Sequence, residues 1–377
     1  MALVKPFRAL MYDVRKAGRL DDLVAPPHDV ISLDDRKRLL ARSPYNVVRL
    51  IRPDEPDDAA EALTAWRADG ILVRDVRPGV WLLAEDFLGP DGRPRTRRGI
   101  VARVRLHPYS DGVILPHERT FGSSRETRLR LLRATRAKLS PILLLHEGPS
   151  PTLDGLGAPD IEATRDGVRS RLWRVDADDA GPLLEAIRPR IIIADGHHRY
   201  DAALRFHEED GTEETAYVLA ALVSRTDGGL VVFPTHRLAG APVPQLNGGV
   251  RTSPLPDGAA AALARLAELP RDRPAYVLLR SDGAVLAETE PVAPGIVGAL
   301  DTTAVDRLPL ADVRFTPSAE EAERAVRDGV AAAAFLVRAP RIDQVEQVAL
   351  AGETMPEKST YFFPKLTSGL LIAPFDE

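Results

Sequence analysis

The sequence predicts a mixed α/β protein of two or three domains. The chain has 377 residues, whereas a domain typically holds about 150. Short apolar runs typical of buried strands alternate with segments whose apolar residues recur at helical spacing. A hydrophobic content of 44% with 28% charged residues indicates packed cores and argues against disorder. No internal repeat is visible, which argues against a solenoid or a propeller.

Charge and cysteine content exclude several classes of protein. The formal net charge of −5 argues against a protein that binds polyanions over its whole surface. The absence of cysteine excludes disulfides, thiolate zinc sites, iron–sulfur clusters and cysteine nucleophiles. The N-terminal residues have no secretory signal, and no apolar run approaches the roughly 18 residues needed to cross a bilayer. We therefore expect a soluble, cytoplasmic protein.

The first unit, residues 1–95, is expected to mix strands and helices. A turn at Gly89 to Gly92 (GPDG) precedes the alternating run 100–106, so the two flanks of the turn should form a hairpin. The other predicted elements of this part of the chain are a strand at 46–51, a helix at 57–68 and a strand at 80–84.

The second unit, residues 96–240, contains a strand that leads into a helix. The β-branched run at 191–194 ends abruptly at Asp195-Gly196, and residues 198–207 follow with helical spacing. This order is typical of a buried strand, a tight glycine turn and a helix N-terminus. Two further short helices are expected at 160–165 and 181–187.

The third unit, residues 241–377, follows a stretch after Leu238 that is rich in proline and glycine, as expected of a domain boundary. Ser318 and Glu321 form a potential capping box for a helix that runs to about residue 328. The further elements predicted are a strand at 331–337 and a helix at 342–351, which Gly352 would end.

The densest chemical cluster is the sequence from Asp195 to Arg199, DGHHR. Backbone N–H groups at the start of a helix bind phosphate, and the side chains of His197, His198 and Arg199 would add donors. Asp195 could hold a magnesium ion or orient a substrate hydroxyl. The simpler alternative is an aspartate cap with incidental histidines on a surface turn.

A competing interpretation is a metal site. His197 and Asp201 are four residues apart, so they would share one face of a helix, and His207 or His236 could complete a ligand set. Such a site would indicate a metal-dependent hydrolase, but no second ligand pair has a recognisable spacing.

A second candidate is the loop that contains His117 and Glu118. A carboxylate beside cations can accept a proton from an attacking hydroxyl, so Glu118 is a candidate general base. A surface ion pair between Glu118 and Arg119 is the alternative. The cations at 125–138 scatter around the predicted helix instead of forming a stripe for DNA, although one or two arginines, such as Arg128, could bind phosphate.

Two further polar segments are candidate site loops. Lys358 and Lys365 lie in an aromatic stretch near the C-terminus and could complete an anion site, or could extend outward from a core strand. His28 and Asp29 lie in a proline-rich loop, which is either part of a site or only a rigid turn.

Common nucleotide-binding motifs are absent from the sequence. It contains no Walker phosphate loop, no G-x-G-x-x-G motif, no nucleophile elbow and no kinase catalytic loop. The standard nucleotide-binding folds are therefore excluded.

Several blocks of the chain, in order, resemble the family numbered 1015 among domains of unknown function. The resemblance covers essentially the whole chain. The blocks are PPHDVIS from Pro26, ILPHERTF from Ile114, RLRLLRATRAKLSPI from Arg128, IADGHHRYDAAL from Ile193, PTHRLA from Pro234 and MPEKSTYFFPK from Met355.

The P-H-E loop followed by the D-G-H-H-R turn also resembles the ParB/sulfiredoxin superfamily, especially its SerK-type free L-serine kinases. This second resemblance covers the middle unit, which it implies to be a ParB/sulfiredoxin-like domain between mixed α/β flanking units. The sulfiredoxin branch needs a cysteine and is excluded. No helix-turn-helix of the ParB type is evident after Leu238.

The resemblance implies roles for individual residues. Glu118 would be the catalytic base, and Asp195 would be the carboxylate that binds metal or orients substrate. Gly196, His197, His198 and Arg199 would form the phosphate cradle. The candidate catalytic residues are therefore Glu118, Asp195 and His198, and the candidate phosphate or nucleotide ligands are His117, Arg128, Gly196, His197 and Arg199. Further candidates for binding a substrate or anion are His28, Asp29, His236, Arg237, Lys358 and Lys365.

The leading hypothesis is a small-molecule kinase that uses Mg²⁺ and ATP or ADP to phosphorylate a hydroxyl, with free L-serine as the implied acceptor. Phosphoryl transfer needs positioning, cations around the moving phosphoryl group and a base near the acceptor, and these residue types can supply all three. The alternatives are a nucleotide-binding, ParB-like regulatory or DNA-associated protein, and the metal-dependent hydrolase. Neither a nucleic acid nor a membrane is the expected partner.

Overall fold

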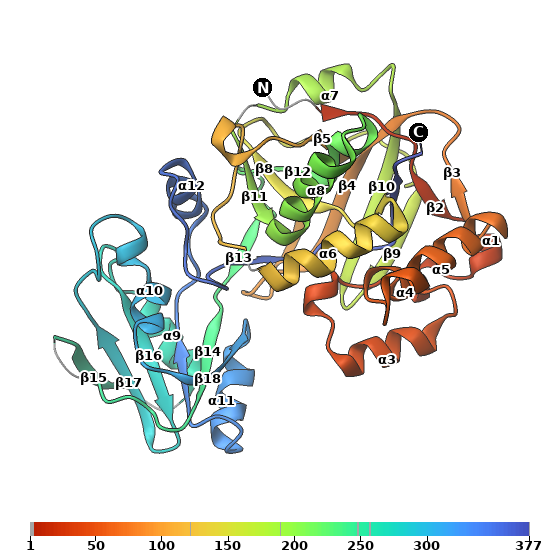
Figure 1. The fold of residues 1–377 in the computed structure, drawn as a ribbon. Helices are drawn as coiled ribbons and strands as arrows, with labels where there is room; N and C mark the ends of the chain where they lie inside the picture. The colour runs from red at the N-terminus through yellow and green to blue at the C-terminus, as the bar shows by residue number, and fades with distance from the viewer. Residues whose placement is uncertain (1–3, 121, 189, 247–248, 256–257, 377) are drawn as a thin grey trace. The chain divides into compact units, whose positions relative to one another are not determined.

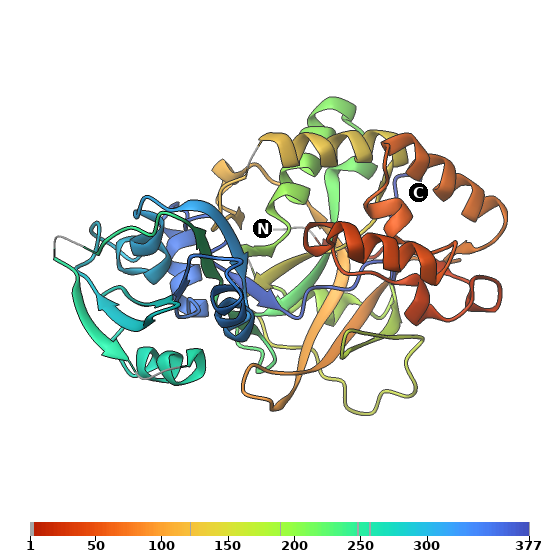
Figure 2. The same ribbon diagram turned by 90° about the horizontal axis from the view of Figure 1, so that it is seen from below.

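The computed structural model describes residues 4–120, 122–188, 190–246, 249–255 and 258–376. The chain folds into two compact units of mixed α/β structure (Figures 1 and 2). Unit 1 comprises residues 4–116, 120–231 and 364–376, and unit 2 comprises residues 117–119 and 232–363. None of the helices among the described residues is both long enough and apolar enough to cross a membrane.

Within the described residues, unit 1 is built on one nine-stranded mixed sheet (Figure 1). Strand β1 (Val4–Lys5) pairs with β5, and most neighbours are antiparallel, whereas β11–β6 and β12–β8 are parallel. The remaining strands in spatial order are β6 (Ile114–Leu115), β11 (Ile191–Asp195), β8 (Ile142–His146), β12 (Tyr217–Ser224), β5 (Pro94–Arg105), β4 (Gly79–Leu88), β10 (Val168–Asp176) and β9 (Ile161–Arg165).

Helices and two small sheets complete unit 1. Helix α8 (His197–Asp210) packs on one face of the sheet through Tyr200 and Ala203, and lies beside α6 (Gly122–Thr135) (Figure 1). The small sheets pair β2 (Leu10–Tyr12) with β3 (Leu72–Arg74) and β7 (Ala137–Lys138) with β21 (Ala373–Pro374). The other helices are α1 (Val14–Ala17), α2 (Leu20–Leu23), α3 (Leu33–Arg42), α4 (Val48–Ile51), α5 (Pro56–Ala68) and α7 (Gly181–Glu185).

Unit 2 contains a six-stranded antiparallel sheet with helices on both faces. Helices α9 (Ala259–Ala267) and α11 (Ala319–Arg327) share a core with one face, and α10 (Asp301–Asp306) packs on the other. Outside this sheet lie helix α12 (Ile342–Leu350) and a two-stranded sheet of β13 (Val231–Phe233) and β20 (Tyr361–Phe363). The sheet order is β15 (Arg251–Leu255), β17 (Gly283–Glu288), β16 (Ala275–Arg280), β19 (Ala333–Leu336), β14 (His236–Gly240) and β18 (Ala311–Thr316).

The division into two units differs from the expected 1–95, 96–240 and 241–377. The first expected boundary falls inside the hairpin of β4 and β5, whose strands pair from Trp81 with Val101 to Leu88 with Pro94. Because one sheet contains strands from both sides of that boundary, the first two segments form a single core. The proline-rich stretch after Leu238 lies within unit 2, since β14 belongs to its sheet.

Two segments differ in secondary structure from the prediction: one predicted strand contains a helix, and one predicted helix is a strand. The expected strand at 46–51 contains the short helix α4, because the Asn46 side chain accepts the Val48 N–H at 2.9 Å and donates to the Asp22 and Val24 carbonyls. The expected helix at 160–165 is strand β9, which pairs with β10 across a turn where Asp166 and Gly167 have positive φ. The main helices and strands expected elsewhere are present.

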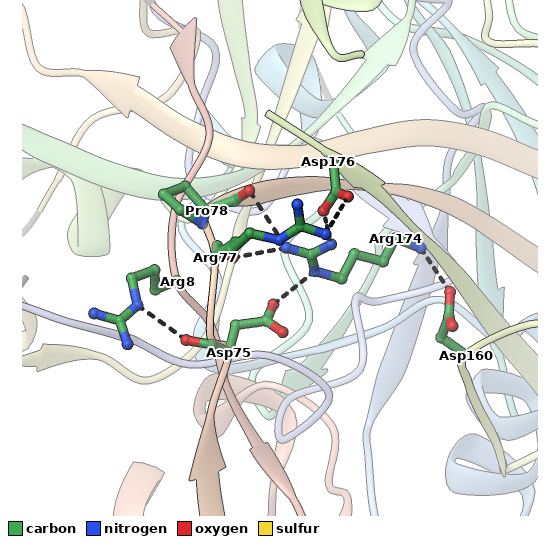
Figure 3. A network of polar contacts seen from close by, with 7 residues as sticks. All are labelled: Arg8, Asp75, Arg77, Pro78, Asp160, Arg174 and Asp176. Carbon is green, nitrogen blue, oxygen red and sulfur yellow. Dashed lines mark hydrogen bonds and ion pairs between the residues drawn. The ribbon is translucent and has the colours of Figure 1, made fainter. Parts of the chain in front are cut away.

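Arg174 on β10 connects several segments of unit 1 (Figure 3). Its guanidinium donates to the Asp75 carboxylate at 3.1 Å, the Arg77 carbonyl at 2.7 Å and the Asp176 carboxylate. The Arg174 side chain is only 21% exposed and that of Asp75 only 13%, so loss of the guanidinium would remove the ion-pair partner of a mostly buried carboxylate.

We predict that Arg174→Met lowers the free energy of unfolding by about 2 kcal/mol. Arg77→Met is the control, because the Arg77 side chain is 69% exposed and its ion pair with Asp176 should contribute less than about 0.5 kcal/mol. Urea unfolding of both variants measures the difference. Equal stability of the two variants would contradict this assignment.

Candidate functional site

The turn between β11 and α8 has a geometry that depends on glycine. The register of β11 against β8 shifts between Ile193 and Asp195, and such an irregularity redirects a side chain at the end of a strand. Gly196 then adopts φ 99°, and a Cβ there would lie 2.6 Å from Cγ2 of Ile142. Helix α8 begins at the next residue, His197. The predicted strand, glycine turn and helix N-terminus are therefore confirmed.

Asp195 forms ion pairs with two cations from different parts of unit 1. Its Oδ2 accepts a hydrogen bond from Arg199 at 2.7 Å, and its Oδ1 pairs with the Lys365 ammonium. Burial raises the pKa of Asp195, but Lys365 and Arg199 together outweigh burial and hold that pKa well below its usual range. Asp195 is therefore ionised, and the C-terminal segment that carries Lys365 reaches the predicted site.

Arg199 is held in place by the backbone as well as by Asp195. Its Nη1 donates to the carbonyl of Pro141, the residue before β8. Its Nε is buried and has no hydrogen-bond partner among the residues that the structure describes. A fixed guanidinium with an unused donor is suited to binding an anion.

A second guanidinium lies close to Arg199. Arg128 on α6 donates to the Ile51 carbonyl at 2.9 Å, and burial together with the charge of Arg199 lowers the pKa of Arg128 to about 10. Burial and the charge of Arg128 lower the pKa of His28 to about 3, so that imidazole is neutral. Asp29 is exposed and offsets part of the positive charge. Two neighbouring guanidinium groups repel each other unless an anion lies between them.

These side chains line a cavity of unit 1. The cavity is partly open to solvent. The polar residues of its lining are His28, Arg128, Lys138, Ser140 and Arg199. The larger apolar side chains in its wall are Ile51, Leu131, Leu132, Leu139, Ile142 and Val218. The cavity therefore suits a ligand that has both an apolar part and an anionic group.

Lys138 is a candidate site residue that the sequence did not single out. It lies on β7, is 5% exposed, and its Nζ is 4.9 Å from the ring centroid of Phe375. Burial and the nearby charge of Arg103 lower the pKa of Lys138 to about 7. In the sequence, Lys138 is one of several cations at 125–138, and only the pairing of β7 with β21 indicates that it is buried.

The other predicted site residues lie in unit 2, close to the segment 354–360. The His117 ring lies 3.0 Å from the Thr360 hydroxyl, and Glu118 Oε1 accepts the Lys358 N–H at 3.4 Å. The neighbouring Arg119 donates to Thr354 at 3.0 Å. This segment therefore positions both polar residues of the P-H-E loop. Phe121, the last residue of that sequence block, lies outside the described residues.

His236 and Arg237 have structural contacts in unit 2. Arg237 donates to both carboxylate oxygens of Asp306, at 2.9 and 3.0 Å, and to the carbonyls of Thr235, Glu357 and Lys358. These hydrogen bonds engage all five N–H donors of the Arg237 guanidinium. The His236 Nδ1 accepts the Val337 N–H at 3.2 Å, and burial lowers the His236 pKa to about 4. These hydrogen bonds favour a role for His236 and Arg237 in stabilising the fold over a role in binding an anion.

Among the residues that the structure describes, no group of three or more His, Asp or Glu side chains is placed to hold a metal ion. Asp201 accepts hydrogen bonds from the hydroxyls of Tyr109 and Thr120, and the His207 ring lies 3.0 Å from the Thr215 hydroxyl. The described part of the chain therefore provides no ligand set for the zinc-type site expected around His197. A magnesium ion would need nucleotide phosphates as ligands in addition to Asp195.

The buried amine of Lys138 predicts a pH dependence of stability. Because its pKa falls from 10.5 to about 7 on folding, the unfolded chain binds more protons between these pH values. The free energy of unfolding should therefore rise with pH, by up to about 1.4 kcal/mol per pH unit from this one group.

Urea unfolding at pH 7.5 and pH 9.5 tests this expectation with Lys138→Met as the matched variant. The wild type should gain about 2 kcal/mol more than the variant over this interval. The control is Lys37→Met, whose side chain is 78% exposed and whose removal should leave the wild-type slope unchanged. Parallel profiles for the wild type and Lys138→Met would show that Lys138 is not a buried amine.

No curated protein matches this chain. Similar solved structures include a free serine kinase in complex with AMP, at 15% identity and a TM-score of 0.39, covering 71% of this chain and 88% of the kinase. A conserved hypothetical protein from Pyrococcus furiosus has 13% identity and a TM-score of 0.37, covering 71% and 92%. SbnI from Staphylococcus aureus, with a C-terminal truncation, has 11% identity and a TM-score of 0.35, covering 73% and 87%.

A family match covers most of the chain. The matched family carries the description "Protein of unknown function (DUF1015)", and its match extends over residues 4–302. This range contains the proline-rich loop at His28, the P-H-E loop and the D-G-H-H-R turn. The chain belongs to the DUF1015 family.

Proposed function

We propose that the protein is a small-molecule kinase that transfers a phosphoryl group from ATP or ADP to a hydroxyl, with free L-serine as the acceptor. The observation that carries the proposal is the pair of guanidinium groups, Arg128 and Arg199, that line one cavity beside the start of α8. Fixed cations at a helix N-terminus are suited to holding phosphate groups. The resemblance to SerK-type kinases supports the same function.

The proposed reaction needs one base and a site for the phosphates. The acceptor oxygen attacks the terminal phosphorus of the nucleotide, and the bond from that phosphorus to the bridging oxygen breaks. ATP then leaves as ADP, or ADP as AMP, and the proton of the acceptor hydroxyl passes to Glu118. Arg128 and Arg199 would neutralise the charge of the phosphates during transfer.

Asp195 has a positioning role in this proposal. Its carboxylate fixes Arg199 and Lys365, so these two cations keep their places before the nucleotide arrives. Mg²⁺, bound with the nucleotide phosphates and Asp195, would add positive charge at the transferred group. His197 and His198 begin α8, where their backbone N–H groups would face a phosphate.

We expect purified protein with Mg²⁺ and ATP or ADP to form phosphoserine when L-serine is added. L-threonine, L-homoserine and glycerol complete the acceptor panel, and mass spectrometry identifies the product. Absence of acceptor-dependent turnover with every acceptor would refute the kinase proposal. Nucleotide binding without turnover would instead support the nucleotide-responsive regulatory protein.

The base assignment has a separate test. Glu118→Gln should lower kcat by at least about 100-fold, as expected for loss of a general base, while nucleotide affinity stays unchanged. Glu357→Gln is the matched control, because Glu357 is an exposed carboxylate in the segment that contacts Glu118. A Glu118→Gln variant with wild-type kcat would exclude Glu118 as the base.

A further inference from the structure

The cavity of unit 1 offers a ligand both cationic and apolar side chains, whereas a phosphate group alone needs only the cations. Its lining includes Arg128, Arg199 and His28, but most of the lining residues form an apolar wall, with side chains from α6, β8 and β12. Inorganic phosphate would need only the cations and would leave this apolar wall uncovered. The combination of cations and apolar side chains suits a ligand with an anionic end and a weakly polar body.

Lys138 adds a specific polar contact to the apolar wall. Its ammonium group is buried and lies 4.9 Å from the centroid of the Phe375 ring, but it has no hydrogen-bond acceptor among the residues that the structure describes. A buried amine is normally hydrogen-bonded or paired. The Ser140 hydroxyl, which also lines the cavity, already donates to Ser368 at 2.8 Å. Lys138 is therefore the residue of this wall with donors to spare for a ligand.

We infer that the cavity binds the base of the nucleotide, and that Lys138 donates a hydrogen bond to an acceptor nitrogen or oxygen of that base. This inference rests on the proposed function, since the phosphates of the same nucleotide would occupy Arg128 and Arg199. A nucleobase has the required chemistry: an apolar face for leucine and isoleucine side chains, and an edge that carries hydrogen-bond acceptors. Lys138 is then a specificity-determining residue that touches the ligand away from the reacting atoms.

Isothermal titration calorimetry with two probes separates the base from the phosphates. ADP carries both groups, whereas pyrophosphate carries the phosphates alone, and both are titrated with Mg²⁺ into the full chain. The wild type should bind ADP at least tenfold more tightly than pyrophosphate. Lys138→Met keeps a similar volume, and should lose about tenfold in ADP affinity while its pyrophosphate affinity stays unchanged.

A second variant tests the cavity without changing a charge. Leu132→Trp places a larger side chain in the wall from the half-buried surface of α6, and should weaken ADP binding without affecting pyrophosphate. Lys37→Met, at an exposed position, is the control and should bind both probes like the wild type. Circular dichroism verifies that each variant is folded.

The titrations show separately whether the cavity binds the base and whether the protein binds phosphate at all. If ADP and pyrophosphate bind equally well to the wild type, or if both cavity variants keep wild-type ADP affinity, the base lies elsewhere and the inference is overturned, while the phosphate site stands. If neither probe binds to the wild type, the proposed function fails and the inference fails with it.

Discussion

The interaction on which the candidate site depends is the pairing of the Asp195 carboxylate with Arg199 and Lys365. It joins the end of β11, the first turn of α8 and the segment that follows unit 2 in the chain. All three side chains are almost completely buried. Removing the carboxylate would take away the negative charge that offsets two largely buried cations, which is more costly than the loss of a surface ion pair. Asp195 therefore fixes both the local fold and the positive charge of the site.

The balance of charge around Asp195 explains why the site favours an anion. Arg128 is a third cation of this region, and its lowered pKa reflects burial and the charge of Arg199. Against these three cations, the region has Asp195 and the exposed Asp29. The excess positive charge beside a helix N-terminus is an arrangement that a phosphate group would stabilise. The candidate base, Glu118, belongs to unit 2 and is positioned there by the backbone at Lys358.

The sequence predicted the local structure of the site well, because the relevant signals are local. A β-branched run, a glycine and helical spacing were sufficient to predict the turn at Gly196. The pairing of Lys365 with Asp195 joins residues 170 positions apart, and no local pattern contains that information. Burial of Lys138 follows from the strand pair β7–β21, which is equally non-local. The helix at Val48 was missed because the Asn46 side chain outweighs the β propensity of the adjoining valines.

If Arg128 and Arg199 together bind the phosphate groups of a ligand, an anion should lie between them. Anomalous diffraction from crystals soaked in tungstate, a heavy-atom mimic of phosphate, would locate that anion. We expect a tungstate peak within hydrogen-bonding distance of both guanidinium groups, and loss of that peak in Arg199→Gln. Tungstate peaks elsewhere on the protein, with none between Arg128 and Arg199, would contradict it.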